Sequence, residues 1–151
     1  MPSYKKGYFH MKGFVTPLGS KESLSSNIVG TKASNLASLI LMAGKEIPLP
    51  PGFCITTNAY NTFLDEHGLF QRIAGILKGV DISNPHLVGT VTETIHDILK
   101  KAEIPAAIME EVNSSFDSLQ KLTGINELRV AVRSSAIGED LSSASFAGQY
   151  E

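Results

Sequence analysis

The chain has 151 residues, 42% of them hydrophobic, and a formal net charge of −2. This length and composition favour one globular domain, or part of a larger one, and exclude wholesale disorder. Thirteen basic against fifteen acidic residues argue against a nucleic-acid surface, and the longest apolar run is far shorter than the roughly 20 residues of a membrane span.

Residues 1–27 have weak periodicity, and within them "GFVTPL" predicts one short strand. From Thr31 to Ala43 the apolar residues fall at helical spacing, which predicts a helix. "FCITT" predicts a second short strand after a proline-rich connector. Thr57 is expected to be the N-cap of the helix that follows, "NAYNTFLDEHG".

The second half of the chain reads as three helices and a strand. The helices are "LFQRIAGILKG", "SNPHLVGTVTETIHDILKKAE" and "IPAAIMEEVNSSFDSLQKLTG". Asn84 or Ser83 can cap the second of them, with Pro85 in its first turn. "ELRVAVRSS" alternates apolar residues with Arg129 and Arg133, which is typical of a strand. The expected fold class is α/β (α+β), with several helices packed on a small sheet.

"IVGTKASNL" is the first candidate for chemistry. A glycine and a small residue lead into a helix that carries Lys32 in its first turn. Free N–H groups at a helix start favour anions, and an ammonium group there can hold a phosphate. The alternative is a solvated lysine in an ordinary first turn, which these residues alone favour.

The second candidate is the segment that follows Arg133. A guanidinium group suits bidentate phosphate binding, and the hydroxyls of Ser134 and Ser135 can add donors. The later "SASFAGQ" is a small-residue loop in which Gly148 lets a backbone approach a ligand closely. A charged strand face that runs into a flexible linker explains the same residues equally well.

Other chemistries find little support. The chain has no HExxH motif, no CxxC pair and no nucleophile elbow around its serines. We therefore identify no catalytic residue and no metal ligand within these 151 residues. The single cysteine, Cys54, and the absence of a recognisable secretory signal indicate a cytoplasmic protein that contacts neither nucleic acid nor membrane.

"VGTKASNL", "IPLPPGFCITTNAYNTFL" and "VAVRSSAIGEDLSSASFAGQYE", in this order, resemble the N-terminal nucleotide-binding domain of one enzyme family. Its members are phosphoenolpyruvate synthase, pyruvate phosphate dikinase and rifampicin phosphotransferase. "FLDEHGLFQRI" is most similar to phosphoenolpyruvate synthase. The resemblance implies the N-terminal subdomain of an ATP-grasp fold over residues 14–151, interrupted at 151, with 1–13 as a lead-in or tail.

The resemblance also implies roles for individual residues. Lys32 and Arg133 match the family's phosphate-contacting lysine and arginine, and Gly148 matches a glycine of the loop that covers the phosphates. Ser134 and Ser135 are further candidates for ATP contact. The chain departs from the family pattern at Thr31, where a second glycine is common, and at Ile137-Gly138, where a Thr-Ala pair is common.

In the family, a phosphoryl group passes from ATP to a histidine on a separate domain and then to pyruvate or another acceptor, with Mg²⁺ on the phosphates. The resemblance implies as partners the remaining ATP-grasp subdomain, the phosphohistidine domain and pyruvate, and it places the metal ligands beyond residue 151. The chain alone is then expected to be inactive. The alternatives are a stand-alone, non-catalytic nucleotide-binding or regulatory module, and a rifampicin phosphotransferase-type acceptor.

Overall fold

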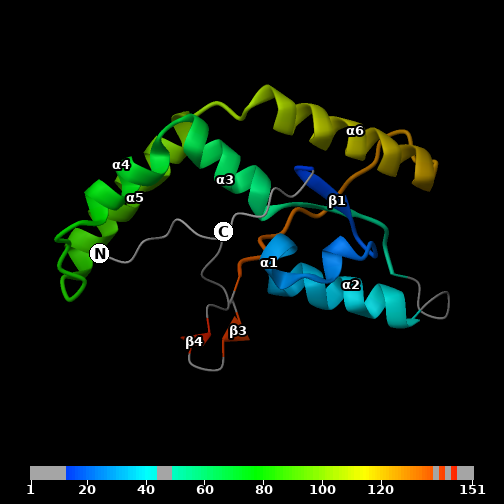
Figure 1. Ribbon diagram of the computed structural model, residues 1–151, viewed down its shortest axis with the longest axis horizontal. Coiled ribbons are helices and arrows are strands. Elements are labelled where there is room, and N and C mark those ends of the chain that lie inside the picture. The colour runs from blue at the N-terminus through cyan, green and yellow to red at the C-terminus, as the bar shows by residue number, and fades with distance from the viewer. Residues whose placement is uncertain (1–12, 44–48, 138–139, 142–143, 146–151) are drawn as a thin grey trace.

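The computed structural model describes residues 13–43, 49–137, 140–141 and 144–145, and most of this part is helical (Figure 1). The elements follow in chain order as β1 (Val15–Pro17), the 3₁₀ helix η1 (Glu22–Leu24), α1 (Ser26–Val29), α2 (Thr31–Ala43), β2 (Phe53–Ile55), α3 (Thr57–Glu66), α4 (Leu69–Leu77), α5 (Pro85–Lys101), α6 (Ala106–Thr123), β3 (Asp140–Leu141) and β4 (Ala144–Ser145). Helices combined with a small antiparallel sheet confirm the expected α+β class.

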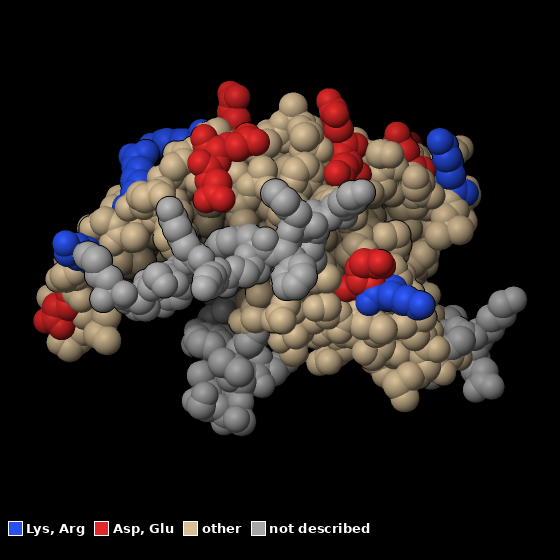
Figure 2. All heavy atoms as spheres, in the orientation of Figure 1, with Lys and Arg blue, Asp and Glu red and all other residues tan. Residues whose placement is uncertain are grey.

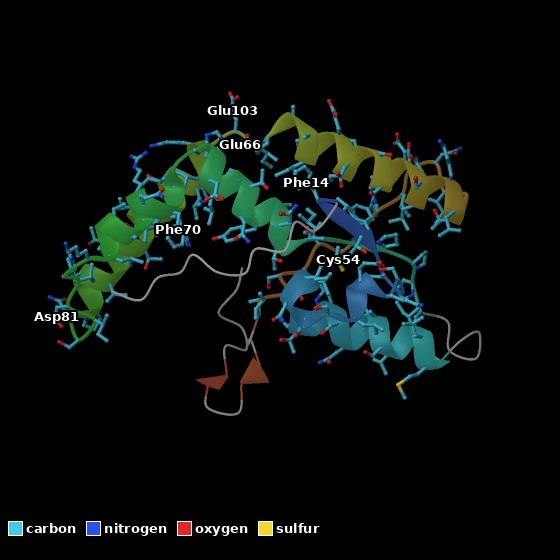
Figure 3. The ribbon with its side chains drawn as sticks, viewed as in Figure 1. Phe14, Cys54, Glu66, Phe70, Asp81 and Glu103 are labelled. Atoms are coloured by element: carbon cyan, nitrogen blue, oxygen red, sulfur yellow. The ribbon has the colours of Figure 1, made fainter. Side chains whose placement is uncertain are left out.

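β1 and β2 form a two-stranded antiparallel sheet in which Thr16 faces Cys54. The ribbon lies between α6 on one side and α1 and α2 on the other (Figure 1). Glu111 of α6 holds the start of β1, because its Oε2 accepts hydrogen bonds from the N–H groups of Phe14, at 2.6 Å, and Val15, at 3.1 Å. Figure 3 shows Phe14 and Cys54 in this central region.

Local capping signals account for two helix starts. The side chain of Asn84 accepts a hydrogen bond from the N–H of Leu87, and Pro85 is the first residue of α5, as predicted. The predicted N-cap at Thr57 is wrong, because the Oγ1 atom of Thr56 accepts from Ala59 N and so caps α3. The hydroxyl of Thr57 instead donates to the carbonyl oxygen of Asn27, which ties α3 to α1.

The apolar core is small and lies around the sheet. Its buried members are Val29, Ala37, Ala59, Leu64, Leu69, Ile108 and Leu119. α5 buries no residue completely, and its apolar stripe begins with Leu87 and Val88, which are exposed. On α6 the stripe ends before Leu122, which is 73% exposed. The sheet end of the molecule is therefore better packed than the α4–α5 end.

The predicted strand "ELRVAVRSS" is wrong, since residues 128–136 have no strand pairing. A strand is held by hydrogen bonds to a neighbouring strand, and within the described ranges β1 pairs with β2 and β3 with β4. The apolar alternation covers no buried face either, because Val130 and Val132 are exposed. The segment instead runs as an irregular connection from α6 toward α1 and α2 (Figure 1).

The small-residue stretch expected as a loop contains a short hairpin. β3 and β4 pair antiparallel, with Asp140 opposite Ser145 and Leu141 opposite Ala144. In Figure 1 this hairpin lies beyond α1, away from α3 to α5. Residues 146–151, which include Gly148, lie outside the described residues.

The described surface carries both signs of charge. On the face shown in Figure 2, acidic side chains line the upper rim and basic side chains lie toward its two ends, without a continuous basic patch among the residues drawn in colour. None of the helices in the described ranges is long and apolar enough to cross a bilayer.

Candidate functional site

The break between α1 and α2 lies at Gly30, which is buried and has φ 78° and ψ 168°. This region of backbone space is essentially restricted to glycine, because a Cβ atom would collide with the neighbouring backbone. Gly30 closes α1 through its N–H, which donates to Ser26, and opens α2 through its carbonyl, which accepts from Ser34 N. The chain thus turns sharply just before Thr31 and Lys32.

The segment after Arg133 lies directly against this turn. A Cβ atom placed on Gly30 would come within 1.8 Å of the carbonyl oxygen of Ser135 and within 2.5 Å of its Oγ. Contact distances under 3.0 Å do not occur for real Cβ atoms, so a side chain at Gly30 would displace the Ser135 backbone. Glycine therefore permits the two segments to touch.

Two hydrogen bonds join the same segments. The N–H of Thr31 donates to the carbonyl oxygen of Ala136 at 3.1 Å, and the N–H of Ala33 donates to Ser135 Oγ at 3.0 Å. The first amides of a helix have no partner within the helix, so Ser135 and Ala136 act as its cap from a distant part of the chain. We call this arrangement of Gly30, Thr31, Ala33, Ser135 and Ala136 the α2 junction.

The α2 junction brings the two sequence-predicted phosphate motifs together. Lys32 lies between the two capped residues and is half-buried, whereas Arg133 is exposed and lies two residues before Ser135. Two residues of chain span about 7 Å at most. The backbone of Arg133 therefore lies near the start of α2, which carries Lys32.

The other residues predicted to contact ATP are Ser134 and Gly148. Ser134 is exposed beside Arg133, whereas Gly148 lies outside the described residues. Of the two departures from the family pattern, Thr31 is the first residue of α2 and its N–H serves the junction. Ile137 follows the junction with 58% of its surface exposed.

The sequence reading missed the part played by Gly30. The glycine before Thr31 was recognised as part of a phosphate motif, but its contact with Ser135 joins segments more than 100 residues apart. A glycine between two runs of helical residues is a signal for a turn. It carries no signal for the partner that fills the space left by the missing side chain.

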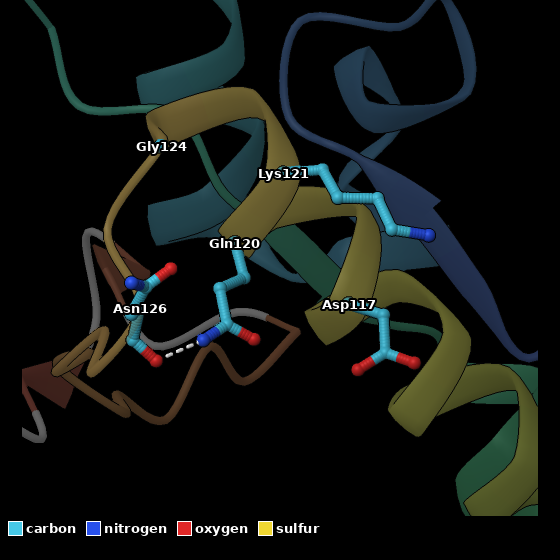
Figure 4. A pocket seen from close by; sticks show the side chains of 5 residues that line it. All are labelled: Asp117, Gln120, Lys121, Gly124 and Asn126. Carbon is cyan, nitrogen blue, oxygen red and sulfur yellow. Dashed lines mark hydrogen bonds between the residues drawn. The ribbon is translucent and has the colours of Figure 1, made fainter.

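Other polar features lie apart from the junction. A shallow depression of about 310 Å³ on α6 is lined by Asp117, Gln120, Lys121, Gly124 and Asn126 (Figure 4). In it the Gln120 side-chain amide donates to the carbonyl oxygen of Asn126. At the corner where α3 approaches the start of α6, His67 Nε2 lies 2.6 Å from the carbonyl oxygen of Glu103, and Figure 3 shows Glu66 nearby.

Two of the described titratable groups have clearly shifted pKa values. Burial raises the pKa of the Cys54 thiol, so less of it is ionised at neutral pH and it is a weaker nucleophile than a free cysteine. Hydrogen bonds from the side chain and backbone of Ser83 lower the pKa of the exposed Asp81 carboxyl group. Within the described ranges, no group of three or more His, Cys, Asp or Glu side chains could hold a metal ion.

Comparison with known proteins shows the family to which the chain belongs. The family "Pyruvate phosphate dikinase, AMP/ATP-binding domain" matches residues 26–151. The matched range includes α1, the whole α2 junction, Lys32 and Arg133.

Three relatives show the extent of the likeness. A probable phosphoenolpyruvate synthase of Methanocaldococcus jannaschii is 35% identical over 130 residues, which cover 86% of this chain and 11% of that protein. The phosphoenolpyruvate synthase of Pseudomonas aeruginosa is 39% identical, covering 82% of this chain and 15% of that protein. The rifampicin phosphotransferase of Bacillus cereus is 33% identical, covering 93% and 15%. The chain thus spans 11–15% of the length of these relatives, and its match to the family covers most of its own length. It belongs to the pyruvate phosphate dikinase AMP/ATP-binding domain family.

Proposed function

We propose that this chain is the ATP-binding part of a phosphotransferase that moves a phosphoryl group from ATP, through a phosphohistidine, to pyruvate. The α2 junction is the observation that carries the proposal, because it brings Lys32 and Arg133 together within a chain of an AMP/ATP-binding family. Phosphoenolpyruvate synthases among the relatives support pyruvate as the acceptor.

The two side chains suit complementary parts of the task. The Lys32 ammonium group is a compact point charge with three donors, and the Arg133 guanidinium group is a planar fork that matches two phosphate oxygens. Together they offset part of the negative charge of a triphosphate and hold it in one orientation. Phosphoryl transfer depends largely on such positioning and charge stabilisation.

Further parts of the proposal concern groups outside the described residues. We propose Gly148 as part of a cover over the phosphates, and a second nucleotide-binding subdomain and a phosphohistidine domain as partners. Mg²⁺ belongs to the proposed chemistry, but the described residues supply no donor cluster for it. The role proposed for this chain is therefore the binding and orientation of ATP.

Rifampicin is a second candidate acceptor, because the Bacillus cereus rifampicin phosphotransferase matches 93% of this chain. A stand-alone, non-catalytic nucleotide-binding or regulatory module would use the same junction without the transfer chemistry. Detection of acid-labile phosphohistidine in the complete protein after incubation with radiolabelled ATP supports the enzyme. ATP binding without any such label supports the module instead.

The nucleotide-binding proposal is tested by substituting Arg133. We expect Arg133→Ala to weaken ATP binding by the chain about tenfold or more, because a charge-assisted contact to phosphate contributes roughly 1.5–3 kcal/mol. Arg129→Ala is the matched control, since Arg129 is also exposed and lies four residues earlier in the same segment. NMR titration with ATP suits the weak binding that we expect of the chain alone.

The two variants separate a specific contact from a general loss of positive charge. Equal weakening by Arg133→Ala and Arg129→Ala would contradict a specific role for Arg133. A parent chain whose spectrum does not change with ATP would contradict the proposed function itself.

A further inference from the structure

Ser135 makes a long-range hydrogen bond that the residues beside it in the sequence do not predict. Its Oγ atom accepts a hydrogen bond from the N–H of Ala33, the third residue of α2, across 102 positions of the chain. The next carbonyl, of Ala136, accepts from the N–H of Thr31. Two amides that would otherwise face solvent or a ligand at the start of α2 are therefore occupied by the chain itself.

This occupancy changes how α2 can contact a phosphate. A helix start binds anions through its free N–H groups, and the N–H groups of Thr31 and Ala33 already have partners. The side chains of Lys32 and Arg133 are the candidates for phosphate contact at this end of α2. Their relative position depends on the junction that holds the 133–136 backbone against α2.

The contact at Gly30 fixes where the 133–136 backbone lies against α2. The Ser135 backbone occupies the space that a side chain at residue 30 would fill, so it can approach α2 this closely only next to glycine. Ser135 is also half-buried, whereas Ser134 and Arg133 are exposed. Ser135 thus contacts the helix, whereas Arg133, two residues earlier, is exposed to solvent.

We infer that Ser135 is a positioning residue: its hydroxyl locks the 133–136 backbone onto α2 so that Arg133 and Lys32 meet the phosphates of one nucleotide. The inference rests on the proposed function, and it assigns Ser135 an indirect role in place of direct contact with ATP. Its consequence is an energetic coupling between Ser135 and Arg133.

A double-mutant cycle tests this coupling in the 151-residue chain. Ser135→Ala is expected to weaken ATP binding about fivefold, the effect of losing one hydrogen bond of typical strength. In an Arg133→Lys background, which lacks the planar fork, the same substitution is expected to cost less than about twofold, because residues that act through each other are not additive. NMR titration with ATP measures all four affinities.

Asn84→Ala is the matched control for the loss of a helix cap. Asn84 caps α5 through one side-chain hydrogen bond, as Ser135 caps α2. We expect the two substitutions to destabilise the chain similarly, and only Ser135→Ala to weaken ATP binding and to accelerate hydrogen exchange at the Ala33 amide. This exchange is measured without nucleotide, so it reports the cap independently of ATP.

The outcomes separate the inference from the proposed function. ATP affinity that is unchanged by Ser135→Ala, or lowered fivefold in both backgrounds, overturns the positioning role while ATP binding by the parent chain upholds the proposed function. The positioning role is also overturned if the Ala33 amide exchanges hydrogen at the same rate in Ser135→Ala as in the parent chain. A parent chain that shows no ATP-dependent shift overturns both.

Discussion

At the scale of single residues, Gly30 is the position where local conformation and distant packing impose the same requirement. Its φ of 78° and ψ of 168° disfavour any side chain, and the Ser135 carbonyl oxygen occupies the space where a Cβ atom would lie. Either constraint alone would favour glycine. Together they make the residue irreplaceable without movement of the segment that carries Arg133.

Gly30→Ala is therefore expected to lower the free energy of unfolding by about 2–4 kcal/mol, from backbone strain and overpacking combined. Gly89→Ala is the matched control, because Gly89 lies in the interior of α5 with nothing within 4 Å of an added Cβ. Alanine there is expected to stabilise the chain by about 0.5–1 kcal/mol through its better helix propensity. Urea unfolding measures both, and the same sign for the two variants would contradict this account of Gly30.

At the scale of elements, Thr56 connects the sheet to the helix that follows it. Its N–H donates to the carbonyl oxygen of Phe14, its hydroxyl donates to Gly13, and its Oγ1 caps α3. One buried residue, through its backbone and its side chain, thus follows β2, caps α3 and holds the residues that precede β1. Thr57, the cap predicted from sequence, makes one hydrogen bond to the Asn27 carbonyl oxygen.

We expect Thr56→Ala to cost about 1–2 kcal/mol of stability, the upper part of the range for a lost N-cap. Thr57→Ala removes a single exposed hydrogen bond and is expected to cost about 0.5 kcal/mol or less. Chemical denaturation of the two variants compares the adjacent threonines directly. A larger loss at Thr57 would show that its side chain, and not that of Thr56, caps the helix in solution.

The other elements show where sequence patterns succeed and fail. The helix over Thr31–Ala43 and the Asn84–Pro85 start of α5 were predicted correctly, because periodicity and capping are properties of neighbouring residues. The strand expected at "ELRVAVRSS" failed, because alternation describes how a strand would face a core and does not supply a strand to pair with it.

At the scale of the whole molecule, the packing is uneven. α2 and α6 each bury residues beside the sheet, whereas α5 packs along α4 at the other end and buries none (Figure 1). Threonine hydroxyls in α5 bond back to carbonyl oxygens one turn earlier, which slightly weakens a helix. Local opening requires least free energy where few apolar contacts are lost.

Amides in the middle of α5 are therefore expected to exchange with solvent faster than those in the middle of α2. Hydrogen exchange under native conditions, followed at Ile95 and Ala37, measures the difference. Ile108→Ala is the control, because it removes a buried side chain from α6 and should lower the protection of α2 with little effect on α5. Equal protection of α5 and α2 in the parent chain would contradict an uneven core.

The sequence by itself determined the longer helices, the short strands of the β1–β2 sheet and the family, and it predicted the two candidate phosphate motifs, since each depends on residues close together in the chain. Only the tertiary structure decided that these motifs meet. The contact between them depends on the absence of a side chain at Gly30, on the Ser135 hydroxyl and on the amides of Thr31 and Ala33, which come from distant parts of the sequence. Such contacts are set by the path of the whole chain, which local propensity does not specify.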